Sequence, residues 1–540
     1  MLKLNSKLLG GAGAALMVAA FAAPAQAQTT PLYSGGGTLA EKVYRDIFNC
    51  YGNQSGGDTT VGLTGPQTGC NGVTPYRSNV EPLYVGVGSG NGKKALVNHD
   101  AAQYVSGGRI PDSVPVPSTS DFNPFYGTGA GAGWVKGTTN PFPKVSFTGS
   151  DDPLTAADIT TYKAVSGWND AAPLSGSWGA PIQVPAFITT ITVPFNPTAG
   201  WNPKNSIPAG GSSGVNLSTN TLCGIFTGAI TDWSNAAITA DNKNVQLGSG
   251  PITVIYRSDG SGSTFLFTNA LIHQCGSQSA PRAGITNNVP DQWLADNSIA
   301  NPAGDPDHIG ASNNNFFINV NTAGHKPANF TGASGSGGVS TAIAGTVGAT
   351  GYLSPDFVKP VITTGLAAAN LQTYASVLAG TKVYKAPTAK TGTGIMSALK
   401  APLFTAASCP TGTAVGQAWD GICAHNPLNW GATNPMPIST AAYPIGGFTF
   451  IDTYTCYASA ADVDAIAGKT VGALGLWTWW FSAPTLNGSV VKTQLTNNGF
   501  SVVPGSWLGG AKKLFTTDVK TKVATPGTAK SPCTTVSGGA

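Results

Sequence analysis

One stretch near the middle of the chain restricts the fold more than any other. Residues 253–257 (TVIYR) are β-branched and aromatic, as in a strand, and an apolar pattern at roughly helical spacing resumes at Phe265. Between them stands the segment DGSG at 259–262, where glycine allows a sharp change of direction. The pattern predicts a strand that turns directly into a helix.

The first turn of such a helix suits an anion. Its leading backbone N–H groups have no partner within the helix and carry the positive end of the helix dipole. Ser261, Ser263 and Thr264 add hydroxyl donors, and Arg257 adds a permanent cation with a planar set of N–H groups. These residues suit a tetrahedral oxyanion. A serine-capped helix behind a glycine turn, with an arginine at the surface, is the alternative that needs no ligand.

A glycine-rich turn near the N-terminus has the same character. Residues 35–38 (GGGT) precede apolar residues at four-residue intervals from Leu39, which predicts a helix. Thr38, followed by Glu41 three positions later, forms a capping-box pattern at the start of this helix. The chain therefore has a second glycine-rich helix start.

Two more turns of this kind follow strand-like runs. GSGNG at 88–92 places Ser89 between a strand pattern and a helical one. FTGSDD at 147–152 ends another run, and Thr155 is expected to cap the next helix. This fourth turn offers carboxylates instead of cations. A surface position near the helix N-terminus is the alternative for Asp151 and its acidic neighbour.

The rest of the chain alternates strand and helix patterns with loop-rich stretches. Trp477, Trp479 and Trp480 are predicted to pack in the core rather than to bind a ligand. The polar tail from residue 511 is expected to lie on the surface, held by Cys533. Strands are predicted at 181–195, 349–353 and 443–451, a helix followed by a turn at 220–235, and helices at 335–343 and 471–481.

The N-terminus has the pattern of a secretory signal. Lys3 and Lys7 precede an apolar stretch that reaches about Phe21, and AQA at 25–27 is a cleavage pattern of small residues. We identify residues 1–27 as a signal peptide. No later segment approaches about 18 uninterrupted apolar residues, so no further membrane span is expected. The mature protein is predicted to be exported and soluble, at most peripheral to a membrane.

Composition narrows the class of protein. The roughly 510 residues after the signal peptide are more than one small core needs, so two or more lobes are expected. Only 10% of residues are charged, and 71 glycines with 38 prolines indicate many turns and long loops. The net charge of +4 mildly favours anions, but no run of Lys and Arg is present, so nucleic acid is not an expected partner.

Eight cysteines, none in a CxxC motif, indicate disulfides in an oxidising compartment rather than a metal site. Eight cysteines allow roughly a hundred connectivities, so the pairing stays open. Proximity in the sequence favours the pairs Cys50–Cys70, Cys223–Cys275, Cys409–Cys423 and Cys456–Cys533.

Other motifs do not support catalytic chemistry. GGSSG at 210–214 matches GxSxG but lacks the flanking strand and helix of a nucleophile elbow. The 5 histidines are scattered without paired spacing, so we expect neither a zinc site nor a Ser/His/Asp triad. No P-loop lysine is present. We therefore expect no metal and no cofactor.

Taken in order, the four turns resemble those of the phosphate-binding proteins that supply phosphate ABC transporters, including the related DING proteins. Weaker similarity extends over the rest of the core and leaves out the loop-rich insertions. The segment at 257–265 is the most specific part of the resemblance. The matching segments are GGGTL at 35–39, YVGVGS at 84–89, FTGSDDPL at 147–154 and RSDGSGSTF at 257–265.

The resemblance implies a phosphate site made from both lobes. Arg257 would bind phosphate with a bidentate guanidinium, Asp151 would contribute a carboxylate, and Asp259 would hold Arg257 in place. Leu39 stands where the family usually has Phe, and Ser263 where it often has Thr; both preserve the backbone or hydroxyl chemistry. The implied phosphate ligands are Thr38, Leu39, Ser89, Asp151, Arg257, Ser261, Gly262 and Ser263.

The implied site also accounts for selectivity. Phosphate at neutral pH still carries a proton, so a carboxylate, which only accepts hydrogen bonds, can take one from it. Sulfate has no proton to give, so the Asp151 carboxylate would face an anion oxygen with no hydrogen to form a bond between them. A site built around a ligand hydrogen can reject an analogue that lacks it by roughly 10⁴ to 10⁵.

The expected fold is α/β: a two-lobed periplasmic-binding-protein fold of type II, with a ligand cleft between the lobes and loop-rich insertions. One lobe is expected to comprise 28–192 and 443–540, and the other 193–442. Hinge closure would bury the ligand. The expected activity is capture of inorganic phosphate by a monomer and delivery to an ABC transporter permease, without covalent chemistry. The insertions are expected at 98–144, 273–329 and 380–440.

Two alternatives stay open at this point. One is an exported phosphatase-like phosphoester hydrolase of the DING type; no convincing nucleophile and base pair supports it, but a serine in the site leaves it open. The other is a surface or secreted protein that scavenges phosphate or adheres to a partner, with the insertions making the contacts. The location is expected to be periplasmic or secreted, and the sequence does not separate the two.

Overall fold

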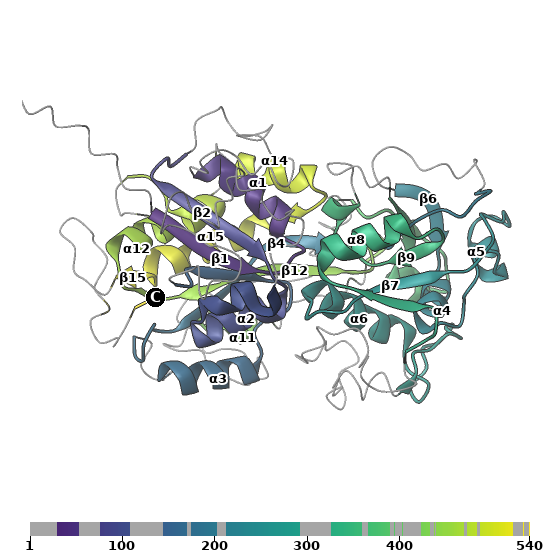
Figure 1. Ribbon diagram of the computed structural model, residues 1–540, viewed down its shortest axis with the longest axis horizontal. Helices are drawn as coiled ribbons and strands as arrows, with labels where there is room; N and C mark the ends of the chain where they lie inside the picture. The colour runs from purple at the N-terminus through teal and green to yellow at the C-terminus, as the bar shows by residue number, and fades with distance from the viewer. Residues whose placement is uncertain are drawn as a thin grey trace, which may run out of the picture.

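The computed structural model describes most of the chain from residue 30 to residue 540. Two groups of helices and strands lie next to each other, one around each of two β-sheets (Figure 1). The predicted signal peptide, 1–27, is outside the described residues. None of the described helices combines the length and the apolar character needed to cross a bilayer. The described residues are 30–52, 76–108, 144–169, 174–201, 212–291, 326–358, 366–388, 394, 402, 423–431, 437, 439–468, 472–482, 487–521, 533 and 539–540.

The first sheet combines strands from both ends of the chain. Its described strands, in spatial order, are β14 (Ser501–Val502), β4 (Pro181–Thr190), β12 (Gly446–Tyr454), β3 (Phe147–Ser150), β1 (Thr30–Gly36) and β2 (Val80–Gly86). β1 runs parallel to β2 and β3, while β12 runs antiparallel to β3 and β4. β12 therefore joins the C-terminal part of the chain to the strands of the N-terminal part.

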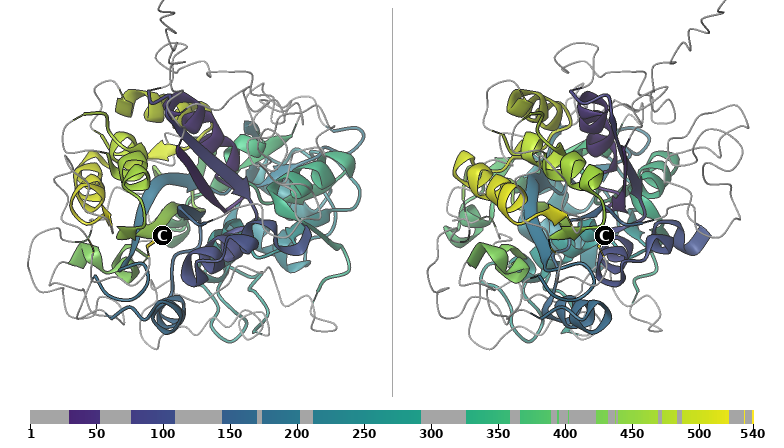
Figure 2. Two further views of the ribbon diagram at one scale, coloured as in Figure 1. Left: turned by 60° about the vertical axis from the view of Figure 1, so that its left-hand side comes forward. Right: turned by 90° about the vertical axis from the view of Figure 1, so that its left-hand side faces the viewer.

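Helices surround the first sheet, as the views in Figure 2 show. α1 connects the parallel strands β1 and β2, as a crossover connection must. The described helices of this group are α1 (Glu41–Tyr51), α2 (Ser89–Asn98), α3 (Ala156–Ser166), α11 (Pro427–Gly431), α12 (Ala460–Ala467), α13 (Leu476–Trp480), α14 (Asn487–Asn497) and α15 (Gly505–Thr517), with 3₁₀ segments η2 (Ala101–Gly108) and η7 (Cys423–His425) and the strand pair β13 (Cys456–Tyr457) and β15 (Lys520–Thr521).

The second sheet is built from the middle of the chain. Its described strands follow the order β11 (Tyr384–Lys385), β10 (Ala367–Gln372), β5 (Pro194–Phe195), β9 (Ala349–Gly351), β7 (Thr253–Arg257) and β8 (Phe330–Ala333), and β6 (Ser212–Leu217) also pairs with β10. Its described helices are α4 (Thr219–Thr227), α5 (Ala236–Asp241), α6 (Gly262–Cys275), α8 (Gly335–Gly345) and α9 (Tyr374–Leu378), with the 3₁₀ segment η4 (Pro355–Phe357). The lobe boundaries at 192 and 443 stay a prediction.

The chain crosses between the sheets at two places that lie together. Ile191, just after β4, donates its N–H to the Ile445 carbonyl, just before β12, at 2.9 Å. The strand predicted at 181–195 is therefore wrong as a single element: β4 and β5 belong to different sheets. The apolar alternation continues through the crossing because that segment is buried as well, so the pattern does not mark the break.

Most other predicted elements are present. The strand and helix of the opening motif are β7 and α6. Thr155 caps α3 through a reciprocal pair of hydrogen bonds with Asp158, as expected for that position. Trp477, Trp479 and Trp480 are buried in the core, as predicted, although α13 is shorter than the predicted helix.

The prediction of a surface tail from residue 511 is wrong for 511–517. These residues form the end of α15, and Ala511, Leu514 and Phe515 are buried. Phe515 stacks on Phe481, with 5.8 Å between the ring centroids. The apolar residues at helical spacing form a buried stripe.

Two predicted disulfides are confirmed. Cys223 in α4 bonds to Cys275 at the end of α6, and Cys456 in β13 bonds to Cys533. The other two predicted pairs each include a residue, Cys70 or Cys409, that is outside the described part of the chain.

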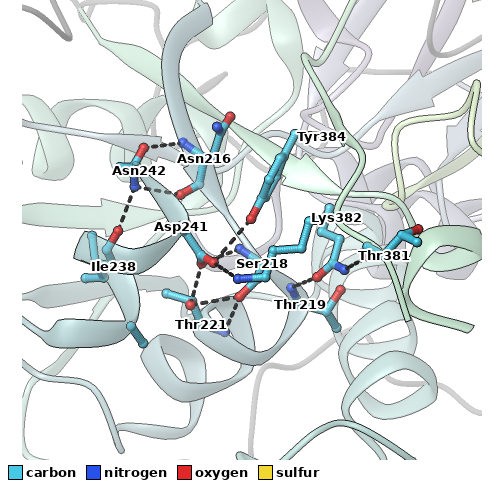
Figure 3. Close-up of polar contacts among 12 residues, drawn as sticks. Asn216, Ser218, Thr219, Thr221, Ile238, Asp241, Asn242, Thr381, Lys382 and Tyr384 are labelled. Carbon is cyan, nitrogen blue, oxygen red and sulfur yellow. Dashed lines mark hydrogen bonds and ion pairs between the residues drawn. The ribbon is translucent and has the colours of Figure 1, made fainter. Parts of the chain in front are cut away.

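A buried carboxylate, Asp241, connects several segments at the edge of the second sheet through hydrogen bonds (Figure 3). Its Oδ2 accepts hydrogen bonds from the Ser218 N–H at 2.7 Å and the Thr221 hydroxyl at 2.6 Å. Its Oδ1 accepts from Lys382 Nζ at 2.8 Å and the Tyr384 hydroxyl at 3.2 Å. These hydrogen bonds lower the pKa of Asp241 despite its burial. The carboxylate thereby joins the start of α4, the end of α5 and β11.

We predict that Asp241→Asn lowers the free energy of unfolding by about 1–3 kcal/mol at pH 7, because buried hydrogen bonds to a charged group are lost. A lowered pKa means that the ionised group stabilises the fold above its ordinary value of 3.8, and that this contribution disappears as the pH falls through the lower folded value. The difference between variant and wild type should therefore shrink at acid pH. Urea unfolding at pH 7 and at low pH measures both quantities.

Lys382→Met is the matched control, since it removes only the ion-pair partner, which is 55% exposed. Exposed ion pairs contribute about 0–1 kcal/mol, so this variant should cost less than Asp241→Asn. Equal losses in the two variants would contradict the assignment of the stability to the buried hydrogen bonds.

Candidate functional site

The predicted helix starts come together where the two sheets meet. Asp151, directly after β3, packs against Gly262, the first residue of α6; a Cβ atom on Gly262 would lie 2.5 Å from the Asp151 Cβ. Only glycine fits at this contact. The Thr38 hydroxyl, before α1, lies 3.0 Å from the Ser336 hydroxyl in α8. Residues associated with both sheets therefore form one buried cluster.

Asp151 is the buried carboxylate of this cluster. Its Oδ1 accepts a hydrogen bond from Thr449 Oγ1 at 2.7 Å, and its Oδ2 accepts one from Ser89 Oγ at 3.3 Å. The Asp151 N–H donates to the same Ser89 hydroxyl at 3.1 Å. Burial raises the pKa of Asp151 to about 7, against the opposing effects of Thr449, Arg257 and Ser89. The surface alternative is wrong for Asp151 and for Asp152, which are both buried.

Arg257 is held by Asp259, as predicted. Arg257 Nε donates to Asp259 Oδ1 at 2.7 Å, and Nη2 pairs with the same carboxylate. Nη1 donates to the Ser336 hydroxyl at 3.1 Å. Asp259 Oδ1 also accepts the N–H of Gly335 at 2.9 Å. The guanidinium is therefore fixed between the end of β7 and the start of α8.

The start of α6 supplies donors. Ser261 is the N-cap, and its hydroxyl accepts the N–H of Thr264 at 3.2 Å. The leading backbone N–H groups of a helix, here including those of Gly262 and Ser263, have no partner within it. The Ser263 hydroxyl is buried without a hydrogen-bond partner among the described residues. Because an unsatisfied buried hydroxyl costs free energy, an acceptor placed here would be stabilising.

The start of α1 differs in detail from the prediction. The helix begins at Glu41, so the capping box predicted for Thr38 and Glu41 is wrong. The later start makes Glu41 the first helical residue instead of the third, and Thr38 Oγ1 accepts the N–H of Ser336 at 3.3 Å instead. Thr38 and Leu39 are both buried.

The sequence interpretation missed Ser336 and Thr449. Ser336 stands in a Gly/Ser helix start and lies between Thr38 and Arg257, so its position in a fifth turn of the same type was a usable signal. Thr449 contacts Asp151 across a separation of 298 residues, within an ordinary strand pattern. No local feature distinguishes it from its neighbours on β12.

The cluster suits the binding of an oxyanion. It combines the Arg257 guanidinium, several hydroxyls and the starts of α2, α6 and α8 with the Asp151 carboxylate, while the Asp259 carboxylate is engaged with Arg257. The donors can bind anion oxygens, and the carboxylate can accept a hydrogen carried by the ligand. Within the described ranges, no group of three His, Cys, Asp or Glu residues could hold a metal ion.

Comparisons with known proteins find relatives that are named for phosphate binding. A phosphate-binding protein from an unknown prokaryotic organism is 28% identical over 420 residues, covering 74% of this chain and 89% of that protein. Alkaline phosphatase L of Pseudomonas aeruginosa is 29% identical over 436 residues, covering 80% and 82%. The crystal structure of a phosphate-binding protein from Stenotrophomonas maltophilia matches with a TM-score of 0.54 and 21% identity, covering 91% and 95%, which shows a common fold.

The predicted two-lobed periplasmic-binding-protein fold of type II is thereby confirmed. The family model described as the PBP superfamily domain matches residues 55–410, which is more than half of the sequence. This chain therefore belongs to the PBP superfamily, and its relatives there include proteins named for phosphate binding.

Proposed function

We propose that this protein is an exported solute-binding protein that captures inorganic phosphate between two lobes and delivers it to an ABC transporter permease. The observation that carries the proposal is the position of Asp151, an acceptor-only carboxylate when ionised, against the start of α6 and under the influence of Arg257. Membership of the PBP superfamily and the relatives named for phosphate binding support it.

In this proposal the lobes are 28–192 with 443–540, and 193–442. Asp259 positions Arg257, and Ser336 is an additional donor because its hydroxyl lies between Thr38 and Arg257. The other phosphate ligands are Thr38, Leu39, Ser89, Asp151, Arg257, Ser261, Gly262 and Ser263.

Selectivity for phosphate follows from the chemistry of the cluster. The donors can bind the oxygens of phosphate and of sulfate equally well, so they do not distinguish the two anions. The ionised Asp151 carboxylate does distinguish phosphate from sulfate, because it can form a hydrogen bond only with a ligand that carries a hydrogen. Charge-assisted hydrogen bonds of about 1.5–3 kcal/mol each support micromolar or tighter affinity after the cost of association.

One observation favours a second candidate, hydrolysis of phosphoesters: a relative aligned over 80% of this chain is named alkaline phosphatase L. A serine nucleophile needs an adjacent base. The Ser261 hydroxyl is engaged as the cap of α6, and Ser263 has no hydrogen-bonded base among the described residues. The geometry therefore favours binding over hydrolysis.

We predict that Asp151→Asn greatly weakens the discrimination between phosphate and sulfate. An asparagine amide can donate to a sulfate oxygen at any pH, so the preference for phosphate at pH 8 should fall by about tenfold or more. Titration calorimetry of protein freed of ligand by unfolding and refolding gives both affinities at pH 8, about one unit above the pKa of Asp151, where the carboxyl is mostly ionised.

Asp232→Asn is the matched control, since Asp232 accepts hydrogen bonds from Ser234 in an exposed turn. Its selectivity should equal that of the wild type. Unchanged selectivity in Asp151→Asn would show that selectivity does not depend on a hydrogen bond from the ligand to this carboxylate. Failure of the wild type to bind either anion would contradict the proposed function itself.

We also predict that the purified protein does not hydrolyse p-nitrophenyl phosphate at a rate that depends on this site. Any residual rate should be the same in wild type, Ser261→Ala and Ser263→Ala, because it would come from a contaminant. A rate that is lost in one serine variant, while phosphate binding persists, would favour the hydrolase instead.

A further inference from the structure

The strand β12 places one threonine directly beside the Asp151 carboxylate. β12 and β3 are antiparallel with Phe450 opposite Ser150, so the next pair outward is Thr449 and Asp151. Thr449 Oγ1 donates to Asp151 Oδ1 at 2.7 Å, and the two residues are 0% and 1% exposed. On its other side, Thr449 pairs with Phe187 of β4. The Thr449 hydroxyl therefore comes from a strand in the interior of a sheet. Because threonine is β-branched, few χ1 rotamers are available to its side chain.

This hydrogen bond determines what Asp151 Oδ1 can do. A threonine hydroxyl carries one proton, and its donation to Oδ1 engages that oxygen as an acceptor. Burial disfavours the ionised carboxyl, and Thr449 has the largest of the opposing effects, ahead of Arg257 and Ser89. The Thr449 hydroxyl on the same sheet therefore supports the ionised state of Asp151 together with Arg257.

The other groups around the carboxyl have a smaller or opposite influence. Arg257 on β7 favours the ionised form, and the neighbouring Asp152 disfavours it. Tyr44 on α1 and Tyr84 on β2 also interact with Asp151, and burial raises the pKa of each phenol well above its ordinary value, so both stay neutral. None of these four replaces the hydrogen bond from Thr449.

We propose that Thr449 is a positioning residue that lets Asp151 act as a hydrogen-bond acceptor from about neutral pH upward, and so sets the pH range over which phosphate is distinguished from sulfate. This inference rests on the proposed function. Without the hydroxyl, the buried carboxyl retains its proton to higher pH and becomes a donor. Sulfate, which carries no proton near neutral pH, is then accepted where the wild type rejects it.

Sulfate is the appropriate probe because it does not titrate between pH 5 and 9, so the pH dependence of its binding reports the protein. We expect the wild type to bind sulfate only on the acid side of neutrality. In Thr449→Val, which replaces the hydroxyl by a methyl group, the pH at which sulfate binding is half lost should rise by about one to two units, a ten- to hundredfold change in proton affinity. Titration calorimetry across this pH range measures the midpoint.

Two further variants test the role of the hydroxyl itself. Thr449→Ser retains it and should keep the wild-type midpoint, whereas Thr449→Ala lacks it and should repeat the shift of Thr449→Val. Thr453→Val is the matched control on β12, because the Thr453 hydroxyl is buried and donates to the Ser146 carbonyl at 3.2 Å. Its midpoint should be unchanged. Circular dichroism and the melting temperature establish that each variant is folded.

The outcomes separate this inference from the proposed function. A wild-type midpoint in both Thr449→Val and Thr449→Ala, with phosphate still bound, would overturn the role of Thr449 and leave the proposed function intact. A wild type that binds neither anion would overturn both. An equal shift in Thr453→Val would mean that the change comes from the strand and not from the hydrogen bond to Asp151, and would also overturn the inference.

Discussion

The structure must stabilise one carboxylate, that of Asp151, which folding removes from water. A buried charge is stable only when it is paired or hydrogen-bonded, and burial is the largest influence on Asp151. The groups that oppose it come from three places: Thr449 on β12, Ser89 at the start of α2 and Arg257 at the end of β7. The carboxylate can therefore remain an acceptor only if the strand β12 of the first sheet, the start of α2 and the strand β7 of the second sheet are all in place.

The strand β12 links this site to the connection between the sheets. It begins at Gly446, one residue after Ile445, whose carbonyl accepts the N–H of Ile191 in the other crossing segment. Thr449 lies only three residues further along the same strand. The group that supports the carboxylate and the segment on which the two sheets are joined are thus parts of one short stretch of backbone. Any shift in this strand would reach both.

Local interactions were predictable from the sequence. Ser261 caps the helix that it precedes, and Thr155 does the same for α3. The contact between Arg257 and Asp259, two residues apart, was implied by the family resemblance. Errors arose where a pattern had two physical explanations. The apolar run at 181–195 continued through the buried segment that crosses between the two sheets. Residues 511–517 belong to α15, which is polar on one face and buried on the other.

The sequence by itself determined most of the helix starts, that of α1 excepted, together with the donors they carry and the acidic turn that contains Asp151, because a chain's turns and caps depend on residues a few positions apart. Only the tertiary structure decided which groups meet there. Ser336 reaches Thr38 and Thr449 reaches Asp151 across 298 residues in each case. The ionisation of Asp151 was decided there too, because desolvation and hydrogen bonding depend on how completely the folded chain surrounds the carboxyl, which no local pattern records.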